Sequence, residues 1–431
     1  MHFINNFDPC WDKIFDTMQT HTLSKKDKKL SGEISLTSSV SVSKRNLLIK
    51  ALKNSKLDMQ SISKKDADKL IDKSLRKGKI SLDAGDPAKA IRFLGAFLSY
   101  FKSDWIITGT AEMHKRPIGD VIDKLRAQGF NVKYLIREGF PPLKVIGKGF
   151  KGNITRVDST ICSQFISTTL VISQSLPANE VEELKNRIMS SPFIDQTIRL
   201  LRYLGVNSNW QKEEILVEYE LNDGSEISIE SDWKSASYWY EMAAIAGKAN
   251  LKIKGLNPDS VQSDAIVKEI FEPLGVKTET VPDGVVLKTT KRRIKSLEYD
   301  FINNPDLVPP LVVTCVALQI PFRFSGIEQL RHKETDRIMI LQSQMNKVGA
   351  KLTVEKKGDM ETLCFNGKMK IPRQKKLAIE TFNDHRMVMA FAPLVMMGVE
   401  VVIDNPRAIA KAYANYWEDF KKVGVSVEQS Q

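Results

Sequence analysis

The chain has 431 residues, more than one ordinary hydrophobic core holds, and this length predicts two domains. Apolar residues make up 42% of the chain and charged residues 27%, which is typical of folded globular proteins and excludes wholesale disorder. The net charge of +12 is compatible with anionic metabolites or nucleic acid. Because the basic residues are scattered and not interleaved with aromatic residues, we expect no nucleic-acid partner.

The sequence also argues against membrane insertion and export. Its longest apolar run, Met387–Val399, contains Pro393 and falls short of the roughly 18–20 residues that a membrane helix needs. The opening MHFINNFDPCWDK lacks the basic start and apolar stretch of a secretory signal. The four cysteines lie far apart without a C-x-x-C pair, which favours a reducing compartment and no structural metal. We therefore expect a cytoplasmic protein without cofactor or metal.

Taken in chain order, residues 1–30 predict an extension to which the sequence assigns no role. Beyond it, strand-like runs alternate with amphipathic helix-like runs, a pattern that predicts a mixed α/β fold. The clearest strand-like runs are WIITGT at 105–110, ILVEYEL at 215–221, GVVLKTT at 284–290 and VEVVID at 399–404.

Five helix-like segments end in a glycine that precedes a short strand-like stretch. These glycines are Gly129, Gly205, Gly275, Gly349 and Gly424, at spacings of 205−129 = 76, 275−205 = 70, 349−275 = 74 and 424−349 = 75. A glycine just past a helix supplies the left-handed conformation that ends it. The near-constant spacing predicts a duplicated α/β unit, and the chain has room for about six copies.

Two charged motifs carry candidate chemistry in the second half. In R-H-K-E-T-D-R, residues 331–337, a helix would place Lys333 and Arg337 on one face. In F-N-D-H-R, residues 382–386, His385 would open a helix, and helix N-termini bind anions through free N–H groups. The ordinary interpretation of each is a surface helix start.

Three further motifs have equally ordinary interpretations. N-P-D, residues 304–306, reads as a helix N-cap made by Asp306. H-K-R-P-I-G, residues 114–119, reads as a strand-to-helix loop in which proline makes Arg116 extended. In S-T-I-C-S-Q-F, residues 159–165, the hydroxyls and Gln164 either bind an oxygen-rich ligand or form a turn.

Six short motifs occur in the same order as in the EPSP (5-enolpyruvylshikimate-3-phosphate) synthase family, which this sequence resembles from about Ile34 to Gly424. They are RPIG at 116–119, SQF at 163–165, SPFID at 191–195, SASY at 235–238, KETDR at 333–337 and NDHRM at 383–387. The resemblance implies a two-domain enolpyruvyl transferase fold of six βαβαββ units, three per domain, with a cleft between the domains. The N-terminal domain would span residues 38–230, and the C-terminal domain residues 1–37 plus 231–431.

The resemblance further implies a metal-free transferase of aromatic amino-acid biosynthesis. It would move the enolpyruvyl group of phosphoenolpyruvate to the 5-hydroxyl of shikimate-3-phosphate, release phosphate and act as a monomer. The acid–base residues would be Asp306, Glu334 and Lys411. Phosphoenolpyruvate would bind Arg116, Gln164, Arg337, His385 and Arg386. Shikimate-3-phosphate would bind Ser41, Arg45, Ser163, Gln164, Ser190, Asp306 and Lys333.

The match to the family weakens in the N-terminal half. Val40 replaces a lysine that contacts both substrates in the family, and Cys162 replaces a serine of the shikimate-3-phosphate site. Lys44 and Lys89 appear in the same motifs, so we expect one or both to restore the lost charge, with Lys89 near phosphoenolpyruvate. Ala88 replaces a glycine, which predicts a narrower phosphoenolpyruvate pocket and weak inhibition by glyphosate.

Three alternatives remain open at the level of sequence. A catalytically impaired paralogue would keep the fold and bind a phosphorylated ligand. The sister enolpyruvyl transferase acting on UDP-N-acetylglucosamine shares the architecture, but KETDR and NDHR favour the shikimate branch. A nucleic-acid-end-processing protein is suggested by net charge alone and would require a basic stripe that the sequence lacks.

Overall fold

The computed structural model describes part of the chain with its side chains and some further strands by their backbone alone. It describes residues 19–39, 104–108, 114, 117–119, 122–123, 126, 131–146 and 230–430, apart from 334, 359 and 370–375. Five further segments, 79–83, 156–158, 180–185, 206–211 and 214–219, are described as strands without their side chains. The chain divides into two compact units, unit 1 (residues 1–39 and 229–431) and unit 2 (residues 40–228).

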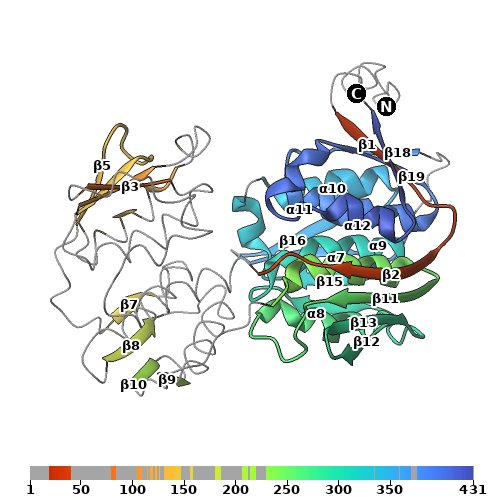
Figure 1. The fold of residues 1–431 in the computed structure, drawn as a ribbon, viewed down its shortest axis with the longest axis horizontal. Helices are drawn as coiled ribbons and strands as arrows, with labels where there is room; N and C mark the ends of the chain where they lie inside the picture. The colour runs from red at the N-terminus through yellow and green to blue at the C-terminus, as the bar shows by residue number, and fades with distance from the viewer. Residues whose placement is uncertain are drawn as a thin grey trace. The chain divides into compact units, whose positions relative to one another are not determined.

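Unit 1 contains three four-stranded sheets (Figure 1). The first has the order β12 (Val276–Val281), β13 (Gly284–Thr289), β11 (Lys248–Lys254), β2 (Lys29–Ser35). The second has the order β14 (Leu297–Asp300), β15 (Phe322–Ser325), β17 (Met360–Phe365), β16 (Thr353–Lys357). The third has the order β18 (Lys376–Ile379), β19 (Glu400–Asp404), β1 (Thr20–Ser24), β20 (Ser426–Ser430).

The strands described in unit 2 form two more sheets of four. One has the order β3 (Lys79–Asp83), β4 (Asp104–Thr108), β6 (Leu143–Ile146), β5 (Asn131–Tyr134). The other has the order β7 (Arg156–Asp158), β8 (Glu180–Lys185), β10 (Glu214–Tyr219), β9 (Val206–Gln211).

All five sheets share one pairing pattern. One edge strand pairs in parallel with its neighbour, and the remaining pairs are antiparallel. In the third sheet of unit 1, β1 from the start of the chain fills the position that a late strand fills in the others, between β19 and β20. A repeated unit of the predicted βαβαββ kind accounts for this pattern, since a parallel pair requires a crossover helix.

In unit 1, two helices accompany each sheet, and they are called its first and second helix in chain order. The first helices are α7 (Trp233–Ile245), η3 with α9 (Pro305–Leu307 and Val308–Ala317), and α11 with η5 (His385–Phe391 and Ala392–Met397). Each second helix follows a short 3-10 turn: α8 (Val267–Phe271) after η2 (Ser263–Ile266), α10 (Arg337–Lys347) after η4 (Glu328–His332), and α12 (Tyr416–Lys422) after η6 (Pro406–Lys411).

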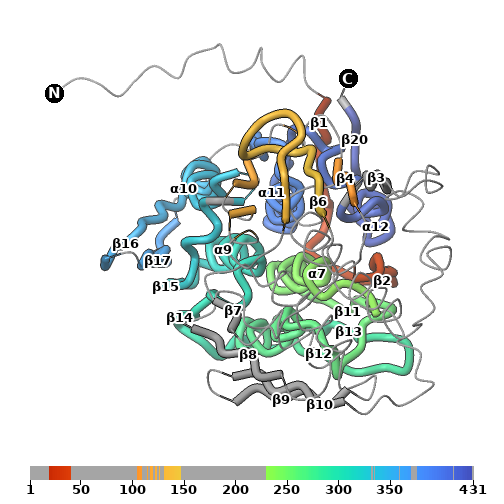
Figure 2. The backbone as a smooth tube through the Cα atoms, turned by 90° about the vertical axis from the view of Figure 1, so that its left-hand side faces the viewer, coloured from red at the N-terminus to blue at the C-terminus, as the bar shows by residue number. Residues whose placement is uncertain are grey.

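The first helices form the centre of unit 1. Figure 2, which looks nearly along their axes, shows α7, α9 and α11 stacked side by side with strands around them. Helix α7 is buried along almost its whole length, including Trp233, Trp239 and Tyr240. One continuous apolar cluster joins these helices to the inner faces of all three sheets, so burial of apolar area holds the helices against the sheets.

Three of the five predicted helix-ending glycines lie in described residues and have the expected conformation. Gly275, Gly349 and Gly424 have φ of 100°, 90° and 82°. After α10 and α12 the backbone N–H of the next residue bonds back five residues, from Ala350 to Met345 and from Val425 to Phe420. This is the hydrogen-bond pattern of a glycine helix end. Gly129 and Gly205 lie outside the described residues.

The chain enters and leaves unit 2 through two paired segments. Ser38 forms an antiparallel bridge with Ser231, and the Ser39 N–H donates to the Glu230 carbonyl at 2.9 Å. Beside them, Ser260 donates to the Glu230 carboxylate at 2.6 Å. The segments that lead into and out of unit 2 are therefore hydrogen-bonded to each other within unit 1.

The strand-like runs named from the sequence correspond to β4, β10, β13 and β19, which confirms them. Within the described part of the chain, no helix combines the length and apolarity that spanning a membrane requires. The same residues hold no group of three His, Cys, Asp or Glu side chains placed to bind a metal.

Candidate active site

The first helices of the three sheets begin close to one another, and each contributes charged residues there. Lys234 lies in the first turn of α7, Asp306 lies in η3 ahead of α9, and Arg386 lies in the first turn of α11. Ion pairs between these residues show that the three helix starts converge. Helix N-termini carry partial positive charge, so this is a favourable place for anions.

Asp306 lies at the centre of the cluster. One carboxylate oxygen accepts from Arg337 Nη1 at 3.3 Å, and the other pairs with Arg386 Nη2 at 3.1 Å. The Lys234 ammonium lies 4.0 Å from the second oxygen. The Asp306 side chain is 14% exposed, so two guanidinium groups and an ammonium hold a nearly buried carboxylate.

A second carboxylate, Asp384, fixes Arg337 from the other side. Arg337 Nε donates to Asp384 Oδ2 at 2.8 Å and Nη2 donates to Oδ1 at 3.3 Å, a two-bond contact. The Arg337 side chain is 1% exposed and that of Asp384 is fully buried. A buried guanidinium is tolerated because all three of its nitrogens donate to carboxylates.

Asp384 also organises the start of α11. Its Oδ1 accepts from the Arg386 backbone N–H at 2.9 Å, and its Oδ2 accepts from the Thr335 hydroxyl at 3.0 Å. His385 is the first residue of the helix, with Nδ1 4.0 Å from Asp384. The prediction that F-N-D-H-R opens a helix is confirmed, and the aspartate is the N-cap residue.

The electrostatics of the cluster keep Asp306 ionised. Burial alone would raise the pKa of Asp306, but the charges of Arg386, Lys333, Lys234 and Arg337 hold it well below its usual value. Burial opposes ionisation of Asp384 too, yet Arg337 keeps its pKa below the ordinary range. Tyr238 of α7 is buried beside Arg386, and burial raises its pKa to about 12. The site is therefore rich in cations with ionised carboxylates between them.

The neighbouring carboxylate Asp264 behaves differently. It is 3% exposed, accepts from Asn304 Nδ2 at 3.3 Å and lies 3.9 Å from the Lys234 ammonium. Burial raises the pKa of Asp264 to about 6, against the lowering effect of Lys234. Lys333, whose charge acts on Asp306, has its ammonium 3.5 Å from the Gln329 amide oxygen.

Five of the site residues named from the sequence have described side chains. They are Asp306, Lys333, Arg337, His385 and Arg386, and direct ion pairs or charge interactions connect Asp306 with Lys333, Arg337 and Arg386. Lys411 ends η6, but its side chain lies outside the description. The other named residues also lie outside the described residues: Ser41, Arg45, Lys89, Arg116, Ser163, Gln164, Ser190 and Glu334.

Two local interpretations of the motifs are wrong. Lys333 and Arg337 do not share a helix, because η4 ends at His332, Lys333 is extended, and α10 begins at Arg337 with Asp336 as its N-cap. Asp306 is not an N-cap: it lies inside η3, and its carboxylate pairs with arginines rather than with backbone N–H groups. In both cases ion pairing across the cluster replaces the local arrangement.

Sequence reasoning missed Lys234, Asp264 and the bridging role of Asp384. Lys234 directly precedes the SASY motif, and a lysine in the first turn of an otherwise buried helix is unusual enough to have flagged it. Asp384 belongs to the F-N-D-H-R motif, and its position directly before His385 indicates an N-cap residue. Asp264 follows a loop and carries no such signal.

Comparison with known proteins assigns the chain to a family. A model of the family described as EPSP synthase (3-phosphoshikimate 1-carboxyvinyltransferase) matches residues 59–420. The chain belongs to the EPSP synthase family. It is 36% identical over 401 residues to a 3-phosphoshikimate 1-carboxyvinyltransferase of Bacteroides fragilis strain YCH46, covering 93% of this chain and 97% of that protein.

More distant relatives agree with the family assignment. A 3-phosphoshikimate 1-carboxyvinyltransferase of a Sulfurovum species is 31% identical over 347 residues, covering 80% of this chain and 79% of that protein. Among solved structures, EPSP synthase from Acinetobacter baumannii aligns with a TM-score of 0.69 at 20% identity, covering 96% of this chain and all of that chain. The enolpyruvyl transferase NikO from Streptomyces tendae aligns with a TM-score of 0.65 at 13% identity, covering 96% and 99%. At these identities the two structures support the two-domain enolpyruvyl transferase fold.

Proposed function

We propose that this chain is a 3-phosphoshikimate 1-carboxyvinyltransferase, which transfers the enolpyruvyl group of phosphoenolpyruvate to the 5-hydroxyl of shikimate-3-phosphate. The observation that carries the proposal is the buried Asp306 carboxylate held between Arg337 and Arg386 in a chain of this family. Two substrates that bring two phosphates and two carboxylates require several fixed cations. The site has four cations that act on Asp306.

The reaction consists of an addition and an elimination. The 5-hydroxyl oxygen bonds to C2 of phosphoenolpyruvate and loses its proton, while C3 gains a proton and becomes a methyl group. The resulting tetrahedral intermediate then loses a proton from C3 and expels phosphate, which restores the double bond. Each half therefore needs one proton donor and one proton acceptor close to the same carbon atoms.

Asp306 is suited to accept a proton and not to donate one in the first half, because its pKa is held well below the usual value. Substrate anions that neutralise Arg337 and Arg386 would raise the pKa of Asp306 and make it a stronger base when the site is filled. The donor in the addition is then another residue, and Glu334 and Lys411 are our candidates. Asp306 would contact the shikimate-3-phosphate hydroxyl as it accepts the proton.

The remaining roles are assigned to binding. Arg116, Gln164, Arg337, His385, Arg386 and Lys89 would hold phosphoenolpyruvate, and Ser41, Arg45, Ser163, Gln164, Ser190 and Lys333 would hold shikimate-3-phosphate. The N-terminal domain would be residues 38–230, and the C-terminal domain would be the rest of the chain. We also propose that the protein acts as a cytoplasmic monomer without metal or cofactor.

The proposal is tested by following both substrates and products with ³¹P NMR. Purified protein with both substrates should convert them into a new phosphate monoester and inorganic phosphate in equal amounts. Phosphate release from phosphoenolpyruvate alone would contradict the proposal, because it indicates a phosphatase. Saturable binding of shikimate-3-phosphate without conversion would replace the proposal with the impaired paralogue.

A further inference from the structure

Lys234 is a charged residue of the cluster to which neither a motif nor the proposed reaction gives a role. It is the second residue of α7, and its side chain is 15% exposed. Its ammonium lies between two carboxylates of different elements, 3.9 Å from Asp264 Oδ2 and 4.0 Å from Asp306 Oδ2. An ammonium so nearly buried is costly unless it is paired, and these two carboxylates stabilise it.

The partners of Lys234 are themselves held in place. Asn304, two residues before Asp306, donates to Asp264 at 3.3 Å, so the loop that carries Asp306 is connected to Asp264 directly and through Lys234. The Asp306 oxygen that faces Lys234, Oδ2, also pairs with Arg386, and the other oxygen, Oδ1, accepts from Arg337. Lys234 thus joins the start of α7 to a carboxylate that is otherwise held by α10 and α11.

The charge of Lys234 acts on both carboxylates. It lowers the pKa of Asp264, which burial raises to about 6 with help from Asp306 and Asp232. It also contributes, after Arg386 and Lys333, to keeping the pKa of Asp306 below its usual value. Without this charge, two carboxylates would face each other across the position of the ammonium.

We propose that Lys234 is a positioning residue of this site: its ammonium connects Asp264 with Asp306 and holds the Asp306 carboxylate in place beside Arg337 and Arg386. The inference rests on the proposed function, in which Asp306 accepts a proton.

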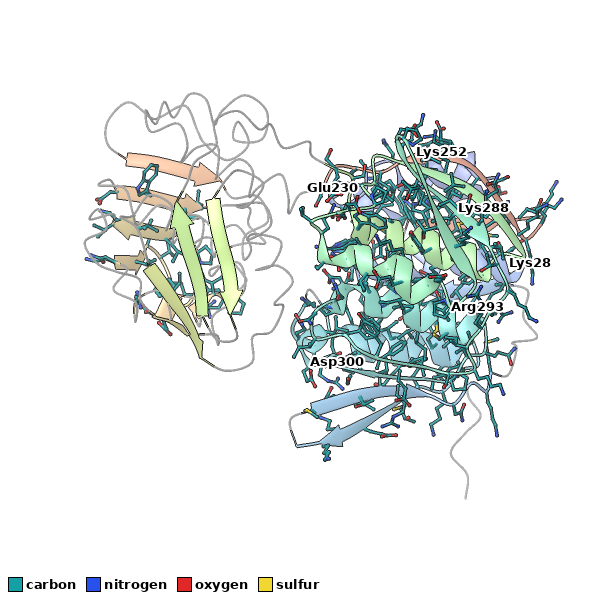
Figure 3. All side chains as sticks on the ribbon, turned by 90° about the horizontal axis from the view of Figure 1, so that it is seen from below. Lys28, Glu230, Lys252, Lys288, Arg293 and Asp300 are labelled. Atoms are coloured by element: carbon teal, nitrogen blue, oxygen red, sulfur yellow. The ribbon has the colours of Figure 1, made fainter. Side chains whose placement is uncertain are left out.

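The test compares Lys234→Met, Lys234→Arg and a matched control. Lys252 of β11 also lies between two carboxylates, Glu33 and Asp283, but it is part-exposed and outside the cluster (Figure 3). Lys252→Met therefore removes a paired lysine elsewhere in unit 1. For each variant, kcat and the KM of both substrates are measured over the widest pH range in which the variant stays folded, including the acidic limb. Thermal unfolding of each variant checks that it is folded.

We expect Lys234→Met to lower kcat by about tenfold or more with smaller changes in KM, because a misplaced base slows the chemical step. The acidic limb of its kcat profile should move upward by about one pH unit, since Asp306 loses an opposite charge. Lys234→Arg should recover most of kcat, and Lys252→Met should match the wild type. A folded Lys234→Met variant with wild-type kcat and pH profile would overturn the inference.

A second measurement decides the inference even if the proposed reaction is not observed. With ¹³C-labelled aspartate, the carboxyl signal of Asp264, assigned through Asp264→Asn, is titrated in wild type and in Lys234→Met. We expect its midpoint to rise by about one unit or more in the variant. An unchanged midpoint would overturn the role of Lys234 whatever the activity. An inactive wild type with a shifted midpoint would contradict the proposed function alone.

Discussion

At the scale of single residues, the site depends on one buried arginine shared by two carboxylates. Arg337 bonds Asp384 through two nitrogens and Asp306 through the third, and it is almost fully buried. Its geometry is therefore set before any substrate binds. An arginine held in this way offers a fixed charge rather than a flexible one, which favours binding of planar or tetrahedral anions.

Asp384→Asn should damage both stability and activity. The change leaves Arg337 buried with one charged partner fewer, and breaking a buried pair costs about 3–5 kcal/mol. We expect a lower midpoint in urea unfolding together with a loss of kcat/KM. Glu355→Gln is the control: it disrupts the two-bond Arg323–Glu355 contact at the exposed edge of a sheet, and it should leave activity unchanged. Equal stability of both variants would contradict the positioning role of Asp384.

The loss of the family lysine at Val40 gives a second test at this scale. Replacing Lys44 and Lys89 together with alanine should abolish activity if they restore the missing charge, because a charge-assisted contact to phosphate contributes about 1.5–3 kcal/mol. Steady-state rates of the double variant decide this. Unchanged rates would show that neither lysine is needed.

At the scale of elements, the glycine ends of the second helices are the part of the fold that sequence predicts best. Gly275 has φ of 100°, and a Cβ there would lie 3.0 Å from both Thr290 O and Arg292 Cγ. Gly275→Ala should lower the free energy of unfolding by about 1–2 kcal/mol, because the left-handed conformation disfavours a side chain. Gly247→Ala, where a Cβ meets nothing nearer than 3.6 Å, is the control and should be close to neutral.

Helix α7 contains a buried titratable group that makes stability depend on pH. Glu241 is fully buried, neither of its carboxyl oxygens has a hydrogen-bond partner among the described residues, and burial raises its pKa well above the usual value. The folded state therefore keeps a proton that the unfolded state loses above about pH 4.3. The stability contributed by the neutral carboxyl is full below that pH and declines as pH rises toward the folded-state pKa.

Glu241→Gln should remove this dependence. The free energy of unfolding of the variant minus that of the wild type should grow by up to about 1.4 kcal/mol per pH unit above pH 4.3. Urea unfolding at several pH values from 4 to 8 measures the difference. A constant difference over that range would show that Glu241 is already ionised in the folded protein.

Elements and site residues were predictable to different degrees, for physical reasons. The strand-like runs and the glycine positions follow from local patterns, so β4, β10, β13, β19 and three helix ends were found. The sequence did not predict that η4 and α10 are separate helices, or that Asp306 lies inside η3. Long-range ion pairs of Arg337 and Asp306 override the local helix signals there. Lys234 was missed because its partners lie 30 and 72 residues away in sequence.

At the scale of the whole molecule, unit 1 repeats one arrangement three times, and the candidate site follows from the repetition. Each sheet contributes a first helix, and the starts of α7, of η3 with α9, and of α11 converge with Lys234, Asp306 and Arg386. The sixfold period in the sequence anticipated the repeated unit. The resemblance placed residues 1–37 in this domain, but the interpretation of residues 1–30 as an extension is wrong for β1. This strand, from the start of the chain, completes the third sheet of unit 1 (Figure 1).

The central claim is that Asp306, held by Arg337, Arg386 and Lys234, is the proton acceptor of enolpyruvyl transfer. It is tested most directly by measuring phosphate release from shikimate-3-phosphate plus phosphoenolpyruvate with wild type and with Asp306→Asn, which keeps the shape but loses the base. We predict release that requires both substrates in the wild type and a fall of about 10²-fold or more in the folded variant. Undiminished release by Asp306→Asn would contradict the account.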